Sequence, residues 1–237
     1  MDKLEILKKI INESDKIVFF GGAGVSTASN IPDFRSSNGI YNQKYKFKPE
    51  VILSHTFFIN KTNDFYDFYF DKMIYLDAKP NYCHKKLKEL EELGKLKGII
   101  TQNIDGLHKK AGSKNVLELH GTIYKNYCMK CNKFYSIYYM INNKDNLICS
   151  CGGIIKPYVI LYEEELNNEI LNKAINLIEN ADTLIVGGTS LNVFPAAGLI
   201  RYFKGKNLVI INKETTNFDN MATLVINDDI NKIFKNI

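Results

Sequence analysis

Six short apolar runs recur along the chain, and most of them are continuous rather than alternating with polar residues. They cover residues 16–20, 98–101, 116–119, 183–186, 208–211 and 223–226. Strands of a parallel sheet are buried on both faces, so they lack the alternation that is typical of a half-exposed strand. The runs therefore predict the strands of a largely parallel sheet.

Segments in which apolar residues have helical spacing lie between these runs. They cover residues 4–11, residues 80–93, which end at Gly94, and residues 166–178, which end near Asn180. Glycine and asparagine commonly follow the last turn of a helix. Strands that alternate with helices are typical of a doubly wound, Rossmann-like α/β fold.

Two stretches interrupt this alternation. Residues 36–79 are rich in Tyr, Phe, Lys and Asn with irregular helical periodicity, and residues 122–155 hold four of the five cysteines. We expect these stretches to form a smaller lobe from a helical insertion and a cysteine module. The main domain would then consist of residues 1–35, 80–121 and 156–237.

The composition is that of a folded protein, because 45% of the 237 residues are hydrophobic. The net charge of +5 comes from lysine, since only Arg35 and Arg201 of the 31 basic residues are arginines. Proteins that recognise bases and phosphates of nucleic acid favour the planar guanidinium group of arginine. The composition therefore argues against a nucleic-acid partner. The N-terminus has no signal-peptide pattern, and no apolar run of 18 residues is present. We expect a cytoplasmic, soluble monomer that does not act on membranes.

A glycine turn, Gly21-Gly-Ala-Gly24, follows the first apolar run. Such a turn lets backbone N–H groups approach a pyrophosphate. Thr27 stands where the hydride-transfer fingerprint has its third glycine, and no ribose-binding acid follows about 20 residues later. The turn alone therefore favours a purely structural role over a nucleotide site, and it argues against a conventional NAD dehydrogenase.

The residues after the turn favour a nucleotide site. The stretch Gly22-Ala-Gly-Val-Ser-Thr-Ala-Ser-Asn-Ile-Pro-Asp-Phe-Arg35 closely resembles the NAD-binding signature of the sirtuins, with Asn30 at a position where that family usually has glycine. Asparagine tolerates a positive φ better than most residues, so the turn should still form. Further segments resemble the family in the same order: residues 101–108, His120-Gly121, residues 187–196 and Asn212.

The resemblance implies an NAD-dependent protein-lysine deacylase and a role for each matching residue. The catalytic residues would be His120, Asn103 and Asp105, with His120 as general base because imidazole titrates near neutrality. The residues that contact NAD would be Ala23, Thr27, Phe34, Arg35, Gln102, Ile104, Asp105, His120, Thr189, Ser190, Asn212 and Asp229.

Several of these residues have a structural alternative. Phe34 fits an ordinary core aromatic, Arg35 a surface cation, and Thr189 and Ser190 a helix N-cap. For Asp33, beside Phe34, we favour an Asx-type cap of its loop over a contact with a ligand.

The same resemblance implies the reaction. The amide oxygen of an acyl-lysine attacks C1′ of the NAD ribose as nicotinamide leaves, Asn103 organises a water, and His120 takes a proton from a ribose hydroxyl. The products would be lysine, nicotinamide and O-acyl-ADP-ribose. A mono-ADP-ribosyltransferase on the same fold and a zinc-ribbon protein without enzymatic activity are the alternatives.

Four cysteines have a spacing close to that of a zinc ribbon, Cys-x₂-Cys followed after 17 residues by Cys-x-Cys. The second pair is one residue shorter than usual, and the following Gly152-Gly153 leaves its backbone free to adapt. Four thiolates leave no open coordination position, so we expect a structural Zn²⁺. Unbound thiols are the alternative. We expect no metal role for Cys83, His84 and His55. The predicted ligands are Cys128, Cys131, Cys149 and Cys151.

Residues 156–164 resemble the segment with which sirtuins pair the acyl-peptide backbone as an added strand. The residues flanking the acyl-lysine would be Ile160, Tyr162, Asn192 and Val193, and Glu163 with Glu164 would favour basic peptides. Sirtuins that remove succinyl or malonyl groups carry a Tyr and an Arg where this chain has Phe68 and Asp71. An acid there repels an acidic acyl group, so we expect acetyl and other neutral acyl groups to be preferred. The partners would be acyl-lysine peptides or proteins.

Overall fold

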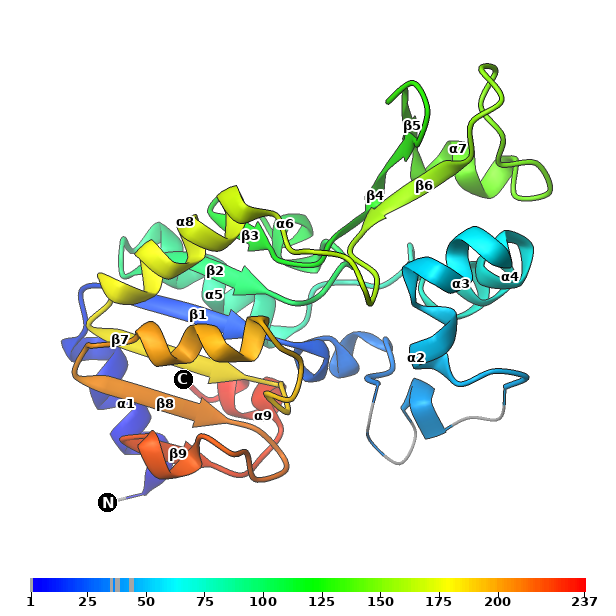
Figure 1. Cartoon of the computed structure of the whole chain (residues 1–237). Helices are drawn as coiled ribbons and strands as arrows, with labels where there is room; N and C mark the ends of the chain where they lie inside the picture. The colour runs from blue at the N-terminus through cyan, green and yellow to red at the C-terminus, as the bar shows by residue number, and fades with distance from the viewer. Residues whose placement is uncertain (1, 35, 37–38, 43–44) are drawn as a thin grey trace.

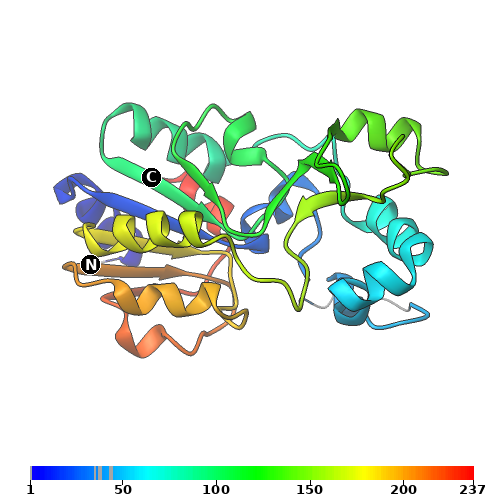
Figure 2. The ribbon, with the colours of Figure 1, turned by 45° about the horizontal axis from the view of Figure 1, so that its top comes forward.

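The computed structural model describes every residue except 1, 35, 37–38 and 43–44. The described chain forms two lobes (Figure 1): a large α/β lobe that contains both termini, and a smaller lobe with a three-stranded sheet and several helices. The turned view in Figure 2 shows the same two lobes joined by several crossing segments.

A six-stranded sheet forms the centre of the large lobe, in the order β3-β2-β1-β7-β8-β9. All neighbouring strands are parallel, and β1 and β7 are buried along their whole length, which explains the continuous apolar runs. The six predicted strands are confirmed, as β1 (Ile17–Gly21), β2 (Leu96–Thr101), β3 (Val116–Glu118), β7 (Thr183–Gly187), β8 (Asn207–Ile211) and β9 (Leu224–Ile226).

The strand order reverses between β1 and β7, since β2 and β3 extend the sheet on one side of β1 and the later strands extend it on the other. Loops that leave the carboxyl ends of strands on the two sides of such a point diverge and open a crevice. The sheet therefore places the ligand site at the ends of β1 and β7.

Helices cover both faces of this sheet, as a doubly wound fold requires. The three predicted helices are present as α1 (Lys3–Glu13), α5 (Tyr82–Glu92) and α8 (Asn168–Glu179). Gly94 follows α5 with φ 72°, and Asn180 caps α8. The other elements of the lobe are α6 (Leu107–Lys110), α9 (Ile230–Lys235), η1 (Ala23–Val25), η2 (Thr27–Ser29), η4 (Ala196–Tyr202) and η5 (Asp219–Met221).

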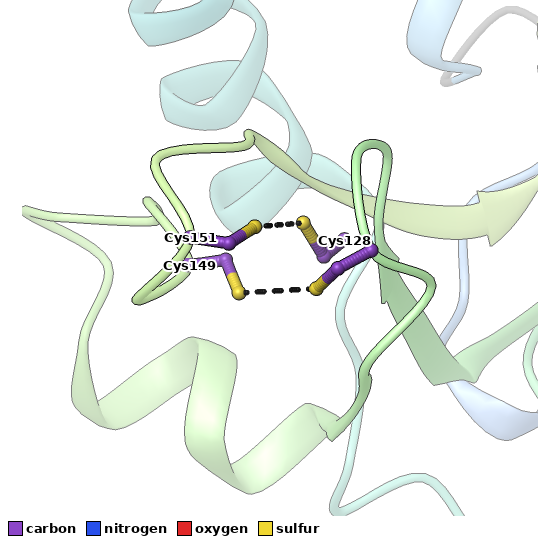
Figure 3. A group of neighbouring side chains, drawn as sticks. Cys128, Cys149 and Cys151 are labelled. Carbon is purple, nitrogen blue, oxygen red and sulfur yellow. Dashed lines mark hydrogen bonds between the residues drawn. The ribbon is translucent and has the colours of Figure 1, made fainter.

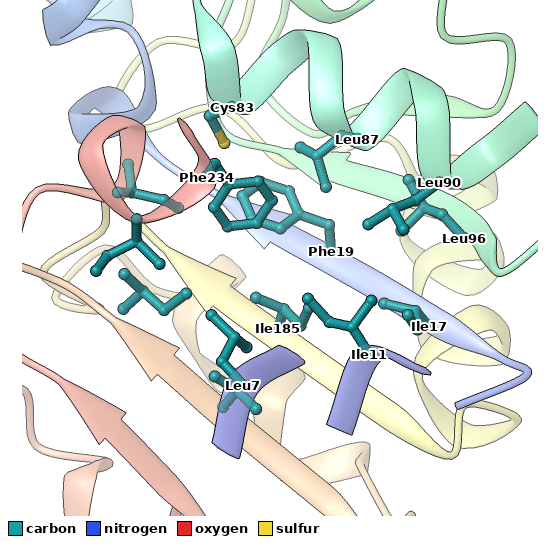
Figure 4. Packing of buried hydrophobic residues seen from close by; sticks show 14 of the residues in the cluster. Leu7, Ile11, Ile17, Phe19, Cys83, Leu87, Leu90, Leu96, Ile185 and Phe234 are labelled. Atoms are coloured by element: carbon teal, nitrogen blue, oxygen red, sulfur yellow. The ribbon is translucent and has the colours of Figure 1, made fainter. Parts of the chain in front are cut away.

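Each face of the sheet has its own hydrophobic core. On one face, Leu7 of α1, Leu87 of α5 and Phe234 of α9 pack with Phe19 and Ile185 of the sheet (Figure 4). On the other, α8 and η4 cover side chains that include Phe20 and Val186. In the described part of the chain, no helix is long and apolar enough to cross a membrane.

The small lobe is assembled from the two stretches that interrupt the alternation of strands and helices. The first stretch contributes η3 (Ile40–Asn42), α2 (Pro49–Ile52), α3 (His55–Asn60) and α4 (Thr62–Lys72). The second contributes an antiparallel sheet in the order β5-β4-β6 and a helix, with bounds β4 (Gly121–Cys128), β5 (Phe134–Ser136), α7 (Ile137–Asn142) and β6 (Ile155–Val159).

One shared core holds the two stretches together. The aromatic side chains of α3 and α4, among them Phe58, Phe65 and Tyr66, pack with Cys128 and Ile155 of the small sheet. The Tyr66 hydroxyl donates to the carbonyl of Ile155. β6 runs through the lobe boundary that we propose at residue 156, so this strand connects the two lobes.

Candidate functional site

A cavity of about 370 Å³ lies at the carboxyl ends of the central strands and extends to the small lobe. Most of the residues predicted to contact NAD or the acyl-lysine line it, whereas Asn192 is exposed and is not among the lining residues. Arg35 lies outside the described residues. The predicted residues that line the cavity are Ala23, Thr27, Phe34, Gln102, Asn103, Ile104, Asp105, His120, Ile160, Tyr162, Thr189, Ser190, Val193, Asn212 and Asp229.

The glycine turn after β1 packs directly on the turn after β7. The amide of Gly24 donates to the carbonyl of Gly188 at 2.8 Å, and a Cβ on Gly24 would lie 2.8 Å from the Cα of Gly188. Only glycine allows this approach of two backbones. Asn30 closes the second 3-10 turn at φ 62° and ψ 27°, so asparagine adopts the left-handed conformation expected of it.

His120 follows β3 and lines the cavity. Its Nδ1 lies 3.0 Å from the carbonyl oxygen of Gln102, which accepts a hydrogen bond only if Nδ1 carries the proton. Nε2 then holds the free electron pair. Burial lowers the pKa of His120 below its ordinary value, and the hydrogen bond to Gln102 partly offsets this. This shift favours the neutral imidazole, the form that a general base needs.

Asp105 is fixed in place at both carboxylate oxygens. Ser26 Oγ donates to Oδ2 at 2.6 Å, and the amide of Leu107 donates to Oδ1 at 2.8 Å. Asn103 Nδ2 donates to Ser26 Oγ at 3.1 Å. Burial raises the pKa of Asp105, whereas the two hydrogen bonds lower it. Sequence reasoning missed Ser26 as a site residue, although it lies inside the glycine-turn stretch, because its partners are 77 and 79 residues away.

Gln102 connects the loop after β2 with the loop after β7. Its Oε1 accepts from Thr189 Oγ1 at 2.9 Å, and Thr189 Oγ1 also accepts from the amide of Leu191. Gln102 Nε2 is buried, and no described residue accepts a hydrogen bond from it. A buried amide donor without a partner is costly unless a ligand or water satisfies it. This donor fits a cofactor rich in acceptors, such as NAD.

Two further predicted residues carry structural contacts. Asp229 caps α9 by accepting from the amides of Asn231 and Lys232, and Lys213 Nζ lies 2.9 Å from its Oδ2. Asp33 Oδ1 accepts from the amide of Ser36 at 2.8 Å, as expected of a loop cap. The ring of Phe34 is half-buried and makes an edge contact with Tyr41.

The predicted substrate segment is held between the lobes. The amide of Ile160 donates to the carbonyl of His120 at 3.0 Å, and the amide of Tyr162 donates to the carbonyl of Leu53 at 2.9 Å. Glu163, at the position of a family glycine, has φ 74°. The carboxylate of Glu164 is engaged by Lys156, His55 and the amide of Leu161. The carboxylate of Glu163 accepts from the amide of Thr56 at 2.9 Å, so neighbouring groups engage both acids.

The four predicted zinc ligands converge from two loops of the small lobe (Figure 3). Their Sγ atoms all lie within 4.8 Å of one another, with 3.4 Å between Cys128 and Cys151 and 3.6 Å between Cys131 and Cys149. Zinc–sulfur bonds of about 2.3 Å in a tetrahedron require S–S separations of about 3.8 Å. The cluster therefore fits a Zn²⁺ site with four thiolate ligands.

The shortened second cysteine pair is supported by its surroundings. Gly152 adopts φ 82°, and a Cβ on Gly153 would lie 2.6 Å from Cys128 Sγ. The buried Tyr135 donates from its hydroxyl to Cys149 Sγ at 3.0 Å. Cys83 lies apart from this group, on α5 in the core of the large lobe (Figure 4). Within the described residues, no second group of at least three His, Cys, Asp or Glu side chains is close enough to hold a metal.

Comparison with known proteins gives consistent matches along the chain. The model of the Sir2 family matches residues 22–195. A Clostridium acetobutylicum protein named NAD-dependent protein deacetylase is 58% identical over 241 residues, with 100% of this chain and 98% of that protein covered. A Staphylococcus epidermidis protein of the same name is 46% identical over 236 residues, with 99% and 96% covered.

Solved structures share the whole fold. One is a Sir2 variant with a deacetylated p53 peptide and 3′-O-acetyl ADP ribose, with a TM-score of 0.92, 38% identity, and 99% of this chain and 97% of that chain covered. Another is Sir2Tm bound to a propionylated peptide, with a TM-score of 0.89, 37% identity, and 99% and 96% covered. Sequence motifs, fold, cysteine cluster and relatives agree, and the chain belongs to the Sir2 family.

Proposed function

We propose that this chain is an NAD-dependent protein-lysine deacylase that prefers acetyl and other neutral acyl groups. Acyl-lysine, NAD and water would give free lysine, nicotinamide and O-acyl-ADP-ribose. Family membership supports the deacetylase activity, and the relatives from C. acetobutylicum and S. epidermidis carry that name. We further propose that it acts as a monomer on acyl-lysine peptides or proteins.

NAD, when bound, supplies an ADP-ribosyl group whose bond to nicotinamide breaks. We assign the residues of this chain to binding and proton transfer around it. Nε2 of His120 takes a proton from a ribose hydroxyl, while the Gln102 carbonyl holds the ring by its Nδ1–H. Asn103 and Asp105 are fixed through Ser26, and Gln102, which lines the cavity, carries a buried Nε2 donor without a partner among the described residues.

We assign the remaining predicted residues to contacts with NAD and with the acyl-lysine. Thr189, Ser190 and Asn212 would contact the phosphate and ribose groups. Ile160, Tyr162, Asn192 and Val193 would flank the acyl-lysine, and the small lobe would support them through the contact between Tyr162 and Leu53. The single observation that carries the proposal is the imidazole of His120, held by the Gln102 carbonyl in the cavity that the family motifs line.

Incubation of the wild-type protein with NAD and an acetyl-lysine peptide tests this function. We expect deacetylated peptide, nicotinamide and O-acetyl-ADP-ribose in equal amounts by mass spectrometry, and no nicotinamide release without peptide. A peptide or protein heavier by one ADP-ribosyl group would instead indicate a mono-ADP-ribosyltransferase. Absence of NAD consumption would support a non-enzymatic zinc-ribbon protein.

The acyl preference rests on α4. Phe68 is buried in the aromatic core of the small lobe, and its side chain has no hydroxyl, whereas sirtuins that remove succinyl or malonyl groups have Tyr at this position. Asp71 is exposed and lies 2.9 Å from Lys72 Nζ, and Lys72 lines the cavity. Asp71 therefore opposes the attraction that Lys72 would exert on an acidic acyl group.

We expect the wild-type protein to deacetylate a peptide at least about tenfold faster than it desuccinylates the same peptide, because Asp71 and a succinyl group repel each other. Asp71→Asn should narrow this ratio by freeing the charge of Lys72. Asp67→Asn is the matched control, since Asp67 is exposed on the same helix and, like Asp71, does not line the cavity, whereas Asp71 is the acid that pairs with Lys72. Comparable wild-type rates on both peptides would refute the preference.

A further inference from the structure

Asn81 lies outside every motif discussed so far, yet its side chain touches the loop that follows β1. Its Nδ2 donates to the carbonyl of Val25 at 2.7 Å and to Ser29 Oγ at 3.0 Å. Val25 belongs to η1 and Ser29 to η2, and both side chains are buried. The side-chain amide of Asn81 therefore holds both 3-10 turns of this loop.

The other end of the same amide is fixed by a helix. Asn81 is the N-cap of α5, and its Oδ1 accepts from the amide of Cys83 at 3.0 Å. The next residue, Tyr82, donates from its amide to Asn231 Oδ1 of α9 at 2.9 Å. Since α5 packs in the core of the sheet, Asn81 connects the loop to a rigid part of the lobe.

A buried histidine, His84, contacts the Asn81 side chain, and a second, His108, packs on the ring of His84. His84 Nδ1 lies 2.9 Å from Asn81 Oδ1, and the ring of His84 packs on His108 with 4.6 Å between the centroids. Both rings are buried, with 0% and 2% of their surface exposed. The amide oxygen thus faces α5 and the histidines, which leaves the NH₂ group to face the loop.

The two turns that Asn81 fastens carry residues that line the cavity. Ala23 lies in η1 and Thr27 in η2. Ser26, between them, donates to Asp105. Each turn has three residues and few hydrogen bonds of its own, so its position depends on outside contacts.

We propose that Asn81 is a positioning residue for NAD: its two N–H groups hold the loop of residues 22–30 in the shape that receives the cofactor. This inference rests on the proposed function, because it assumes that NAD occupies the cavity. Asn81 lines no part of the cavity and acts only through Val25 and Ser29.

The substitution Asn81→Asp separates this role from helix capping. Aspartate keeps the Oδ1 acceptor and is itself a favourable N-cap, so α5 retains its cap. It loses both donors and places a carboxylate oxygen against the carbonyl of Val25. Asn167→Asp is the matched control, because Asn167 caps α8 by accepting from the amide of Ile170.

For Asn81→Asp, calorimetry should give an NAD Kd that is at least about tenfold higher, as two hydrogen bonds are lost. The KM for NAD should rise in parallel, while the KM for the acetyl-lysine peptide stays within twofold. Asn81→Ser, which also caps, should weaken NAD binding as well. Hydrogen exchange of residues 22–30 should become faster in the free protein. Asn167→Asp should leave all of these values unchanged.

An unchanged NAD Kd in Asn81→Asp, with a wild type that binds NAD, would overturn the inference and leave the proposed function intact. A thermal unfolding temperature that falls alike in Asn81→Asp and Asn167→Asp, with NAD affinity falling only in proportion to the folded fraction, would also overturn it. Failure of the wild type to bind or consume NAD would instead refute the proposed function.

Discussion

Replacement of His120 by alanine should lower kcat for peptide deacetylation by at least about 100-fold, the usual contribution of a positioned general base. His120 is the residue at which the proposed reaction needs a basic atom, and its Nδ1 contact with the Gln102 carbonyl leaves Nε2 free for that task. The NAD Kd, measured by calorimetry, should change by less than about threefold, because the glycine turn and the Gln102 amide remain.

A second variant distinguishes the loss of the basic atom of His120 from the loss of its side-chain volume. His120→Asn keeps a side-chain donor close to the position of Nδ1 but has no basic atom, so it should lose as much activity as the alanine variant. The assay is nicotinamide release with an acetyl-lysine peptide, and circular dichroism checks the fold. If His120→Asn kept more than about a tenth of the wild-type rate, the assignment of His120 as base would be wrong.

The wild-type pH profile provides an independent check on the same residue. Burial lowers the pKa of His120 below its ordinary value of about 6.5, so the neutral form persists to lower pH than in a free histidine. The value of kcat/KM should therefore be level between about pH 7 and 8 and fall only below about pH 6.5, as the base becomes protonated. A decrease of kcat/KM at low pH with its midpoint above pH 7 would contradict a lowered pKa for His120.

Replacement of Cys128 by serine should abolish zinc binding and unfold the small lobe. Cys128 is fully buried, and both it and Cys149 belong to the aromatic core that joins the cysteine module to α3 and α4. A structural Zn²⁺ contributes on the order of 10 kcal/mol to the folding of small zinc modules, as much as the whole stability of an ordinary domain. Zinc content by mass spectrometry should fall from about one ion per chain to nearly none, with loss of activity and faster proteolysis of residues 122–155.

Two comparison variants make this result specific. Cys83→Ala removes the fifth cysteine from the core of the large lobe and should keep full zinc content at a stability cost of about 1 kcal/mol. Tyr135→Phe removes only the hydroxyl that donates to Cys149 Sγ, so zinc should bind but be lost faster to a chelator. Activity lost in the Cys128→Ser variant while the fold remains intact would contradict a structural role for the metal.

The elements of the fold were predictable because burial of a strand or helix leaves a local pattern. The runs at residues 183–186 and 208–211 are continuous because β7 and β8 lie inside the sheet. The extent of α5 followed from Gly94, which takes the left-handed conformation after the last turn. Whether the shortened second cysteine pair can bind zinc was harder to judge from spacing. Its geometry depends on the left-handed backbone of Gly152 and on Tyr135, which comes from β5.

The candidate site was only partly predictable. Its motif residues follow strands, and the carboxyl ends of parallel strands share one edge, so the sequence indicated that they gather there. The contacts that hold them were not visible in the sequence: Ser26 with Asp105, Gln102 with Thr189, and Asn81 with Val25 join segments between 56 and 87 residues apart.

The sequence by itself determined the six strands of the large sheet, the principal helices, the four-cysteine cluster and the family, because each of these depends on short-range spacing or on contiguous motifs. The tertiary structure alone decided which nitrogen of His120 meets the Gln102 carbonyl, which neighbouring groups engage Glu163 and Glu164, and which side chain holds the loop of residues 22–30. These properties depend on distances between atoms that are remote along the chain, and such distances are set only when the sheet and the two lobes pack together.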